Sequence, residues 1–264
     1  MRTCIFCSNP ADSLEHVVGE WLSKAMQMRE MTVLPTLILD DRVSEQRPPI
    51  KFEHLRTKIV CGSCNNGWMS DLEAEFKNAH VNLVSPGVFD ETAAASELID
   101  ANYDHLTRWM VKTALVLERA APKNANQIVP ETMLRIRDMT LDDHRLYVYA
   151  AMSMEPGFHF QLTKGFRGQN GSKFLENMNH KDSFRFSTQL NNLLLSVVHC
   201  PEAQGGFESP LTIMGRVMAP IISGVSLGIF QPAMHIFPNF ETFCRSIFVI
   251  ADNPVECGQS INSP

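Results

Sequence analysis

Apolar residues recur at three- and four-residue steps in two stretches of the chain, and this spacing predicts helices. The clearer stretch has its apolar positions at Ile99, Tyr103, Leu106, Met110, Ala114 and Leu117. The other stretch follows Cys64, and its residues Ser70 and Glu73 have the spacing of a capping box. We therefore expect Glu73 to cap a helix at Ser70, although the helix can also begin as early as Asn65.

From about residue 145 onward the pattern changes to short and alternating apolar runs, which are typical of β-strands. The predicted strands cover residues 146–149, 158–162, 184–186 and 193–198. Residues 217–237 contain no Asp, Glu, Lys or Arg and are long enough to span a bilayer. Because Pro220 and Pro232 divide this segment, we interpret it as buried strands joined by turns. The prediction is an α+β fold, with an N-terminal module at 1–80 and an accessory domain at 81–264 that has a helical middle and a mostly β end.

The amino-acid composition indicates a globular protein and excludes some classes of nucleic-acid binder. Hydrophobic residues make up 44% of the chain and charged residues 20%, which is typical of a globular protein. The net charge of −6 excludes a histone-like or tail-driven nucleic-acid binder, because no overall positive field attracts phosphate. It does not exclude a nuclease, in which a metal ion or a local basic patch meets the phosphate. The N-terminus lacks the apolar segment of an export signal, so we expect a cytoplasmic protein without membrane association.

Four of the seven cysteines form two Cys-x-x-Cys pairs, Cys4 with Cys7 and Cys61 with Cys64. At this cysteine frequency, chance supplies only about 0.2 such pairs. Each pair aims two thiolates at one point, and two pairs complete the tetrahedral set of four sulfurs that binds structural Zn²⁺. A site of this kind has no open position for water, so the predicted zinc stabilises the fold and does not catalyse.

The residues around the cysteine pairs form a second pattern. Between the pairs stand Glu15-His16-Val17 and Trp21-Leu22, and the second pair continues as Cys61-Gly62-Ser63-Cys64-Asn65-Asn66-Gly67-Trp68-Met69. In the order and spacing of these elements, residues 4–76 resemble the HNH endonucleases of the ββα-metal class. The likeness is strongest to a bacterial group with Cys-x-x-Cys, Glu-His-Val and Cys-x-x-Cys-Asn-x-Gly-Trp-Met. The resemblance implies that the N-terminal module is a ββα-metal nuclease domain.

The resemblance also implies roles for three residues. A phosphodiester resists hydrolysis because its charge repels the nucleophile and its leaving alkoxide is poor, and a divalent cation offsets both problems. In the family an acidic residue and an Asn hold this single cation, which corresponds here to Glu15 and Asn65 with Mg²⁺ or Mn²⁺. The histidine after the acidic residue is the family's general base, here His16. Because neighbours on a strand point to opposite faces, the Glu15-His16 pair requires a bend or bulge.

Two positions depart from the family pattern. Gly19 stands where a proline is frequent, and Arg56 or Thr57 stands where an asparagine usually braces the loop of the base. Two functions therefore stay open. The first is a metal-dependent endonuclease acting on nucleic acid, with DNA as the expected substrate and a homodimer through the C-terminal region as a further expectation. The alternative is a zinc-stabilised protein that binds nucleic acid or protein without catalysis.

Overall fold

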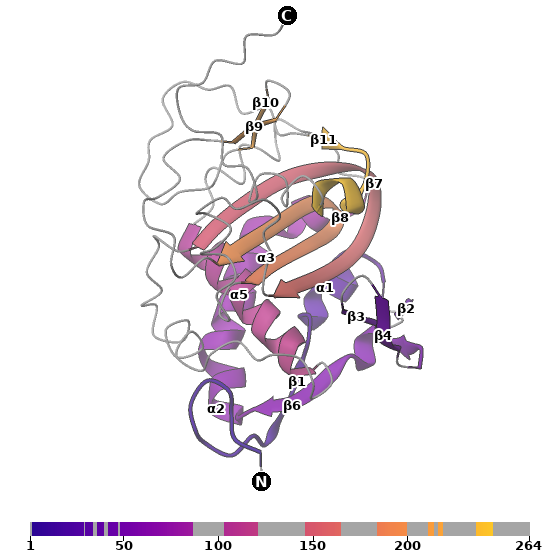
Figure 1. The fold of residues 1–264 in the computed structure, drawn as a ribbon. Helices are drawn as coiled ribbons and strands as arrows, with labels where there is room; N and C mark the ends of the chain where they lie inside the picture. Colours follow the sequence, from indigo (N-terminus) through magenta and orange to yellow (C-terminus); the bar gives the residue numbers. More distant parts are fainter. Residues whose placement is uncertain are drawn as a thin grey trace, which may run out of the picture. The chain divides into compact units, whose positions relative to one another are not determined.

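The computed structural model describes residues 2–28, 30–33, 36–39, 42–46, 48–86, 103–120, 146–164, 184–199, 211–213, 216–218 and 236–244. These residues combine helices with strands, so the predicted α+β class is confirmed (Figure 1). They form two compact units, of which the first contains the described residues up to 86 together with 108–120. No helix in the described ranges is both long and apolar enough to cross a membrane.

The first unit contains an antiparallel ribbon of β1 (Ser13–His16) and β6 (Arg56–Val60). After β6 the chain passes through α2 (Gly62–Cys64), the turn η2 (Asn65–Met69) and α3 (Ser70–Val84), with a kink at Gly67, whose dihedral angles of φ −99° and ψ −122° are not helical. The helix α5 (Tyr103–Ala120) adds its residues from Arg108 onward to this unit. One strand pair followed by a helix is therefore present beside the four cysteines, which all lie near the N-terminus of the chain.

The segment between β1 and β6 consists of short elements. It begins with α1 (Glu20–Ala25) and ends with the 3-10 turn η1 (Phe52–His54). Between them, β2 (Thr32–Val33) pairs with β5 (Ile50–Lys51), and β3 (Thr36–Leu39) pairs with β4 (Arg42–Gln46), both in antiparallel fashion. These short elements make up most of the chain between the two cysteine pairs.

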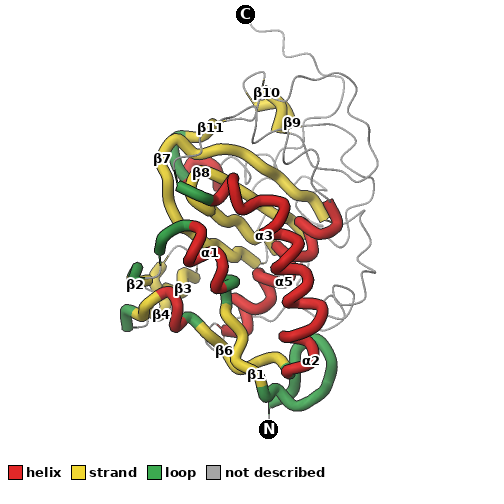
Figure 2. The backbone as a smooth tube through the Cα atoms, turned by 180° about the vertical axis from the view of Figure 1, so that it is seen from behind, coloured by secondary structure: helices red, strands yellow, loops and turns green. Residues whose placement is uncertain are grey.

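The core of the first unit lies where α3 and α5 pack together (Figure 2). Phe76 of α3 stacks on Trp109 of α5, with ring centroids 4.0 Å apart, and Trp21 of α1 tilts against Phe76 at 5.8 Å. The predicted helical positions Met110 and Ala114 are buried as their spacing requires. All residues from 109 to 116 are buried, so the buried surface of α5 is much wider than the predicted apolar stripe.

The second unit contains two long antiparallel strands, β7 (Leu146–Lys164) and β8 (Phe184–His199), with β11 (Ile236–Phe237) parallel to β7. The four strands predicted between 146 and 198 lie within these two strands. Pro156-Gly157 resembles a chain break in the sequence, but a register shift between Met152 and Gly157 absorbs the extra residues and the strand continues. A separate pair consists of β9 (Leu211–Ile213) and β10 (Arg216–Met218). Most of the predicted strand region at 217–237 lies outside the described residues.

Candidate functional site

The four cysteines of the two Cys-x-x-Cys pairs meet in one cluster. Their sulfur atoms all lie within 4.8 Å of one another, and Cys7 Sγ lies 3.4 Å from the sulfur atoms of both Cys61 and Cys64. In a tetrahedral zinc site with Zn–S bonds of about 2.3 Å, the sulfurs are about 3.8 Å apart. The four-cysteine cluster therefore has the size and the donor atoms to bind a metal ion such as zinc.

Backbone hydrogen bonds hold both cysteine turns in place. In the first turn, the N–H of Ile5 donates to the carbonyl of Ile59 on β6 at 3.0 Å. In the second turn, the N–H of Gly62 donates to Asp12 Oδ1 at 2.8 Å, and the N–H of Cys64 donates to Cys61 Sγ at 3.4 Å. Asp12 precedes β1 and Ile59 lies near the end of β6, and Ser13 pairs with Val60, so both cysteine turns are attached to the same end of the antiparallel ribbon.

Glu15 is a buried carboxyl on β1, with only 7% of its surface exposed. Its Oε1 lies 3.8 Å from the ammonium nitrogen of Lys112. Burial raises the pKa of Glu15 to about 7, against the opposing charge of Lys112 and with the support of the Glu73 carboxylate. Burial disfavours the charged form of a carboxyl, and here this effect outweighs the attraction of the nearby Lys112.

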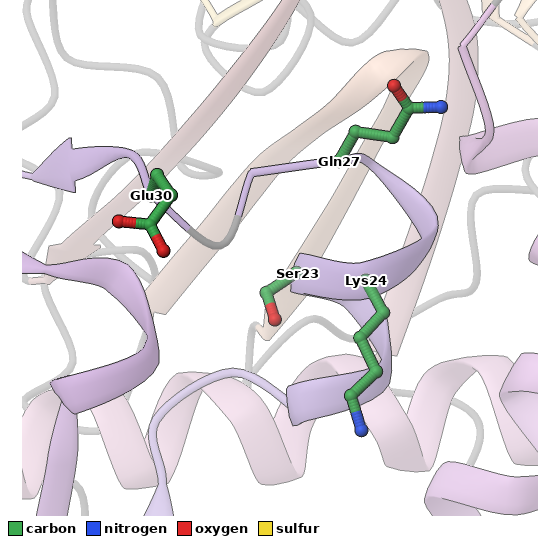
Figure 3. A pocket seen from close by; sticks show the side chains of 4 residues that line it. All are labelled: Ser23, Lys24, Gln27 and Glu30. Atoms are coloured by element: carbon green, nitrogen blue, oxygen red, sulfur yellow. The ribbon is translucent and has the colours of Figure 1, made fainter.

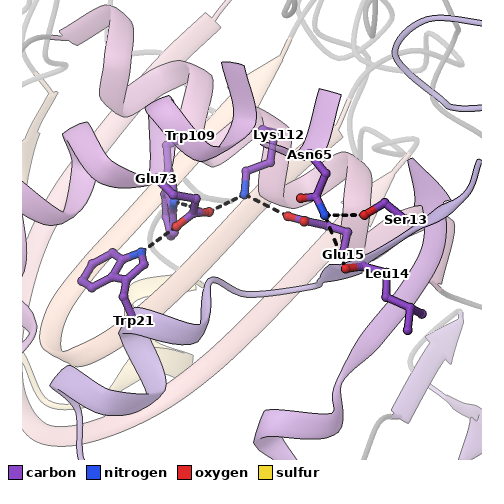
Figure 4. Close-up of polar contacts among 8 residues, drawn as sticks. All are labelled: Ser13, Leu14, Glu15, Trp21, Asn65, Glu73, Trp109 and Lys112. Atoms are coloured by element: carbon purple, nitrogen blue, oxygen red, sulfur yellow. Dashed lines mark hydrogen bonds and ion pairs between the residues drawn. The ribbon is translucent and has the colours of Figure 1, made fainter. Parts of the chain in front are cut away.

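Lys112 is fully buried between two carboxylates, Glu15 and Glu73 (Figure 4). Glu73 also accepts hydrogen bonds from two indole N–H groups, from Trp21 at 2.6 Å and from Trp109 at 3.0 Å. Side chains from β1, α1, α3 and α5 therefore converge on one polar network inside the first unit. We call Glu15, Glu73, Lys112, Trp21 and Trp109 the buried charge network.

The prediction that Glu73 caps a helix is wrong. The chain is already helical before Ser70, and Met69 has helical dihedral angles of φ −71° and ψ −41°. The backbone leaves helical geometry at Gly67 (φ −99°, ψ −122°) and is helical again from Trp68, so the helix begins before Ser70 and Ser70 is not its N-cap. The carboxylate of Glu73 is turned instead to the indoles and to Lys112.

Asn65 is fastened to β1. Its side-chain amide donates to Ser13 Oγ at 2.8 Å and to the carbonyl of Leu14 at 3.4 Å, which are the two residues before Glu15 (Figure 4). Asn65 begins the turn η2, two residues before the kink at Gly67. The structure thus brings Asn65 to the strand that carries Glu15 and His16.

His16 is half-buried and has a different partner. Its Nε2 accepts a hydrogen bond from Nε of Arg56 at 2.9 Å, and the two residues stand opposite each other in the β1–β6 ladder. Burial, and next the charge of Arg56, lowers the pKa of His16, whereas the carboxylates of Glu20 and Glu73 oppose this shift. The charge of Glu73 thus acts on both His16 and Glu15, but no described hydrogen bond joins His16 to Glu15 or Asn65.

The ribbon carries an irregularity close to the predicted bulge. Ser13 pairs with Val60 and Glu15 pairs with Thr57, so two residues of β6 stand opposite Leu14 alone. The bulge therefore lies on β6 and one residue before Glu15, whereas the sequence predicted it in β1 at Glu15-His16. Leu14 is exposed and Glu15 is buried, as expected for neighbours on a strand.

An open hollow of about 370 Å³ lies elsewhere in the first unit (Figure 3). It is lined by Ser23, Lys24, Gln27 and Glu30, and by none of the three predicted site residues. Lys24 forms an exposed ion pair with Glu20 at 2.8 Å. Lys24 is also near enough to His16 for its charge to contribute to the lowered pKa of the imidazole.

Sequence reasoning missed the buried charge network and the partner of His16. Lys112 carries one usable signal, because it stands in the apolar run Trp109-Met110-Val111-Lys112-Thr113-Ala114, and a buried lysine needs a carboxylate partner. The sequence pattern included Trp21 and Glu73 but did not show their contact with each other, because their partners come from distant parts of the chain.

Comparisons of the chain with protein-family models, with curated proteins and with solved structures gave no match. The function is therefore inferred from the residues and contacts of this chain.

Proposed function

We propose that the first unit is a zinc-stabilised, metal-dependent endonuclease that hydrolyses phosphodiester bonds in nucleic acid, with DNA as the expected substrate. The observation that supports it best is the pair of hydrogen bonds from Asn65 to Ser13 and Leu14. These bonds join the start of the helix to the strand carrying Glu15 and His16, beside the four-cysteine cluster. They connect the two segments that the sequence pattern requires to act together.

The donor atoms suit a hard divalent cation. Glu15 offers a carboxylate and Asn65 an amide oxygen, and Mg²⁺ prefers oxygen ligands of both kinds. When Glu15 and Glu73 are both ionised, Lys112 neutralises only one of the two carboxylates. A cation held by Glu15 and Asn65 would balance the remaining charge, and when bound it supplies positive charge to a phosphate oxygen and to the leaving oxygen.

His16 is the proposed general base. Its lowered pKa keeps the imidazole neutral at physiological pH, the form that takes up a proton. In the proposed step a water oxygen forms a bond to phosphorus while one water proton moves to His16. The bond between phosphorus and the leaving sugar oxygen breaks, and that oxygen takes a proton from solvent.

Plasmid cleavage tests this proposal. Purified protein is incubated with supercoiled plasmid and with Mg²⁺, Mn²⁺ or Ni²⁺, and the wild type is compared with His16→Ala and with His54→Ala. His54 is an exposed histidine of the same unit, with 62% of its side chain accessible, so it is the matched control. We expect cleavage by the wild type and His54→Ala and a loss of about 100-fold or more in His16→Ala. Equal activity in His16→Ala, or no cleavage by the wild type, contradicts the proposal.

One observation favours the alternative, a zinc-stabilised binding protein without catalysis. Glu15 already has a cationic partner in Lys112, and His16 already has one in Arg56. Metal analysis separates the two functions. The endonuclease retains one tightly bound zinc and also binds a weaker divalent ion, which Glu15→Gln abolishes while the zinc stays. The binding protein retains zinc and binds no second ion, even with nucleic acid present.

A further inference from the structure

The hydrogen bond between Arg56 and His16 occupies the nitrogen that a general base would use. A neutral imidazole has one N–H and one nitrogen with a vacant lone pair. Nε2 of His16 accepts from the guanidinium at 2.9 Å, so the lone pair is on Nε2 and the proton is on Nδ1. In this arrangement neither nitrogen can take a proton from water.

The backbone sets up this pairing and leaves the arginine accessible. His16 and Arg56 are opposite partners in the β1–β6 ladder, and the N–H of Val17 extends the ladder by donating to the carbonyl of Leu55 at 3.0 Å. Arg56 is exposed, and no carboxylate among the described residues forms an ion pair with it. Its bond to His16 uses Nε only, so the planar fork of the guanidinium has no anionic partner there.

A guanidinium in this position suits phosphate better than imidazole. The fork of arginine matches two phosphate oxygens and forms two parallel charge-assisted hydrogen bonds. In these bonds both the donor and the acceptor are ionised, whereas in the bond to the neutral imidazole of His16 only the donor is ionised. A phosphate that approaches β6 therefore competes successfully with His16 for Arg56.

We propose that Arg56 is a substrate-operated lock on the base. In the free protein its guanidinium occupies Nε2 of His16, and the phosphate of a bound nucleic acid draws the guanidinium away and frees the lone pair. Arg56 then binds the phosphate while His16 accepts the proton of water. This inference rests on the proposed endonuclease function and adds the residue that contacts the substrate phosphate and the event that releases the base.

Nitrogen-15 NMR of the full chain with labelled histidine tests the lock directly. The probe is a short DNA duplex, added to zinc-loaded protein without Mg²⁺ or Mn²⁺, and the His16 signals are assigned by their absence in His16→Gln. We expect DNA to move the Nε2 resonance of His16 in the wild type toward the position of an unbonded nitrogen. In Arg56→Ala the resonance should already be at that position and stay there when DNA is added. The matched control is Lys58→Ala, which removes one exposed positive charge from the same strand and should behave as the wild type does.

Cleavage kinetics give a second measurement. Arg56→Ala should raise KM about tenfold relative to Lys58→Ala, as expected for one lost charge-assisted contact, while kcat is retained. The proposal is contradicted if DNA does not shift the Nε2 resonance of His16 in the wild type. It is also contradicted if Arg56→Ala lowers kcat without changing KM. If the wild type cleaves no nucleic acid with any of the three metals, the endonuclease proposal fails, and the NMR titration still decides whether a phosphate removes Arg56 from His16.

Discussion

Replacing Lys112 with methionine tests the buried charge network most directly. The ammonium is fully buried and serves two carboxylates, Glu15 and Glu73. At the 3.8 Å that separates Lys112 from Glu15, with an effective dielectric constant of about 20, one pair has a Coulomb energy of about 4 kcal/mol. Removing one partner of a buried ion pair destabilises a protein by about 3–5 kcal/mol, because the other charge is left uncompensated. We expect Lys112→Met to lower the free energy of unfolding of the first unit by that amount at pH 8.

Tryptophan fluorescence during urea unfolding is the appropriate assay. The chain has three tryptophans, and Trp21, Trp68 and Trp109 all belong to the first unit, so their fluorescence reports on that unit alone. The loss in Lys112→Met should shrink at pH 5.5. Burial already raises the pKa of Glu15 to about 7, and the lysine opposes this shift, so without the lysine the carboxyl is protonated at pH 5.5 and carries no charge.

The control is Lys77→Met, which removes an exposed lysine from α3 and should change stability by less than about 0.5 kcal/mol. Lys112→Met combined with Glu73→Gln and Glu15→Gln should recover part of the loss, because the triple variant has no buried charge left in the network. The reasoning is refuted if Lys112→Met is as stable as the wild type at pH 8. It is also refuted if the loss is the same at pH 5.5 and pH 8.

Three further outcomes are expected. Cys61→Ser should remove the bound zinc measured by mass spectrometry and unfold the first unit at a lower urea concentration, and retention of one zinc per chain would contradict the four-cysteine site. Gly19→Ala should destabilise the first unit by about 1–3 kcal/mol, because the added Cβ would overlap Glu73 Oε2 and lie 2.9 Å from Trp21 Nε1, whereas a Cβ at Gly67 would meet nothing within 4 Å. Burial lowers the pKa of His80 from 6.5 to about 4, so the unfolded chain binds more protons between these values and stability falls as the pH drops through them. The full loss is about 3 kcal/mol, and His80→Leu should abolish that part of the pH dependence.

The sequence was sufficient for features that depend on local spacing. Two cysteines three residues apart can aim both sulfur atoms at one point when the chain turns between them, and the two pairs do meet in one cluster. The spacing of Met110 and Ala114 likewise predicted α5, because helical periodicity is a property of the segment itself. The likeness to HNH nucleases stays a prediction, since it depends on the roles of Glu15, His16 and Asn65.

Features that depend on distant partners could not be predicted. Glu73 has the local spacing of a cap, but Trp21, Trp109 and Lys112 approach it from other helices, and these contacts decide its role. Pro156-Gly157 is a turn signal by composition, but pairing with β8 carries the strand past it. In both cases tertiary contacts prevail over a local preference.

The chain lacks the asparagine that usually braces the loop of the base in HNH nucleases, and in the structure an arginine contacts His16 instead. Arg56 stands in the region where that residue was expected and reaches the imidazole of His16 from the neighbouring strand. The sequence showed the departure but could not show the hydrogen bond, because the bulge in β6 sets which residue of the strand faces His16.

The position of Lys112 has a consequence for how the N-terminal half of the chain matures. A nascent chain released as far as residue 86 already carries all four thiols, the strand ribbon and both acidic side chains, but not the ammonium that lies between them. Before α5 has been synthesised, packing of β1 against α3 would bury two carboxylates without a cationic partner. Glu15 and Glu73 therefore stay hydrated until Lys112 is available. A fragment that ends after α3 would accordingly retain the four-cysteine cluster but could not complete the core of the first unit.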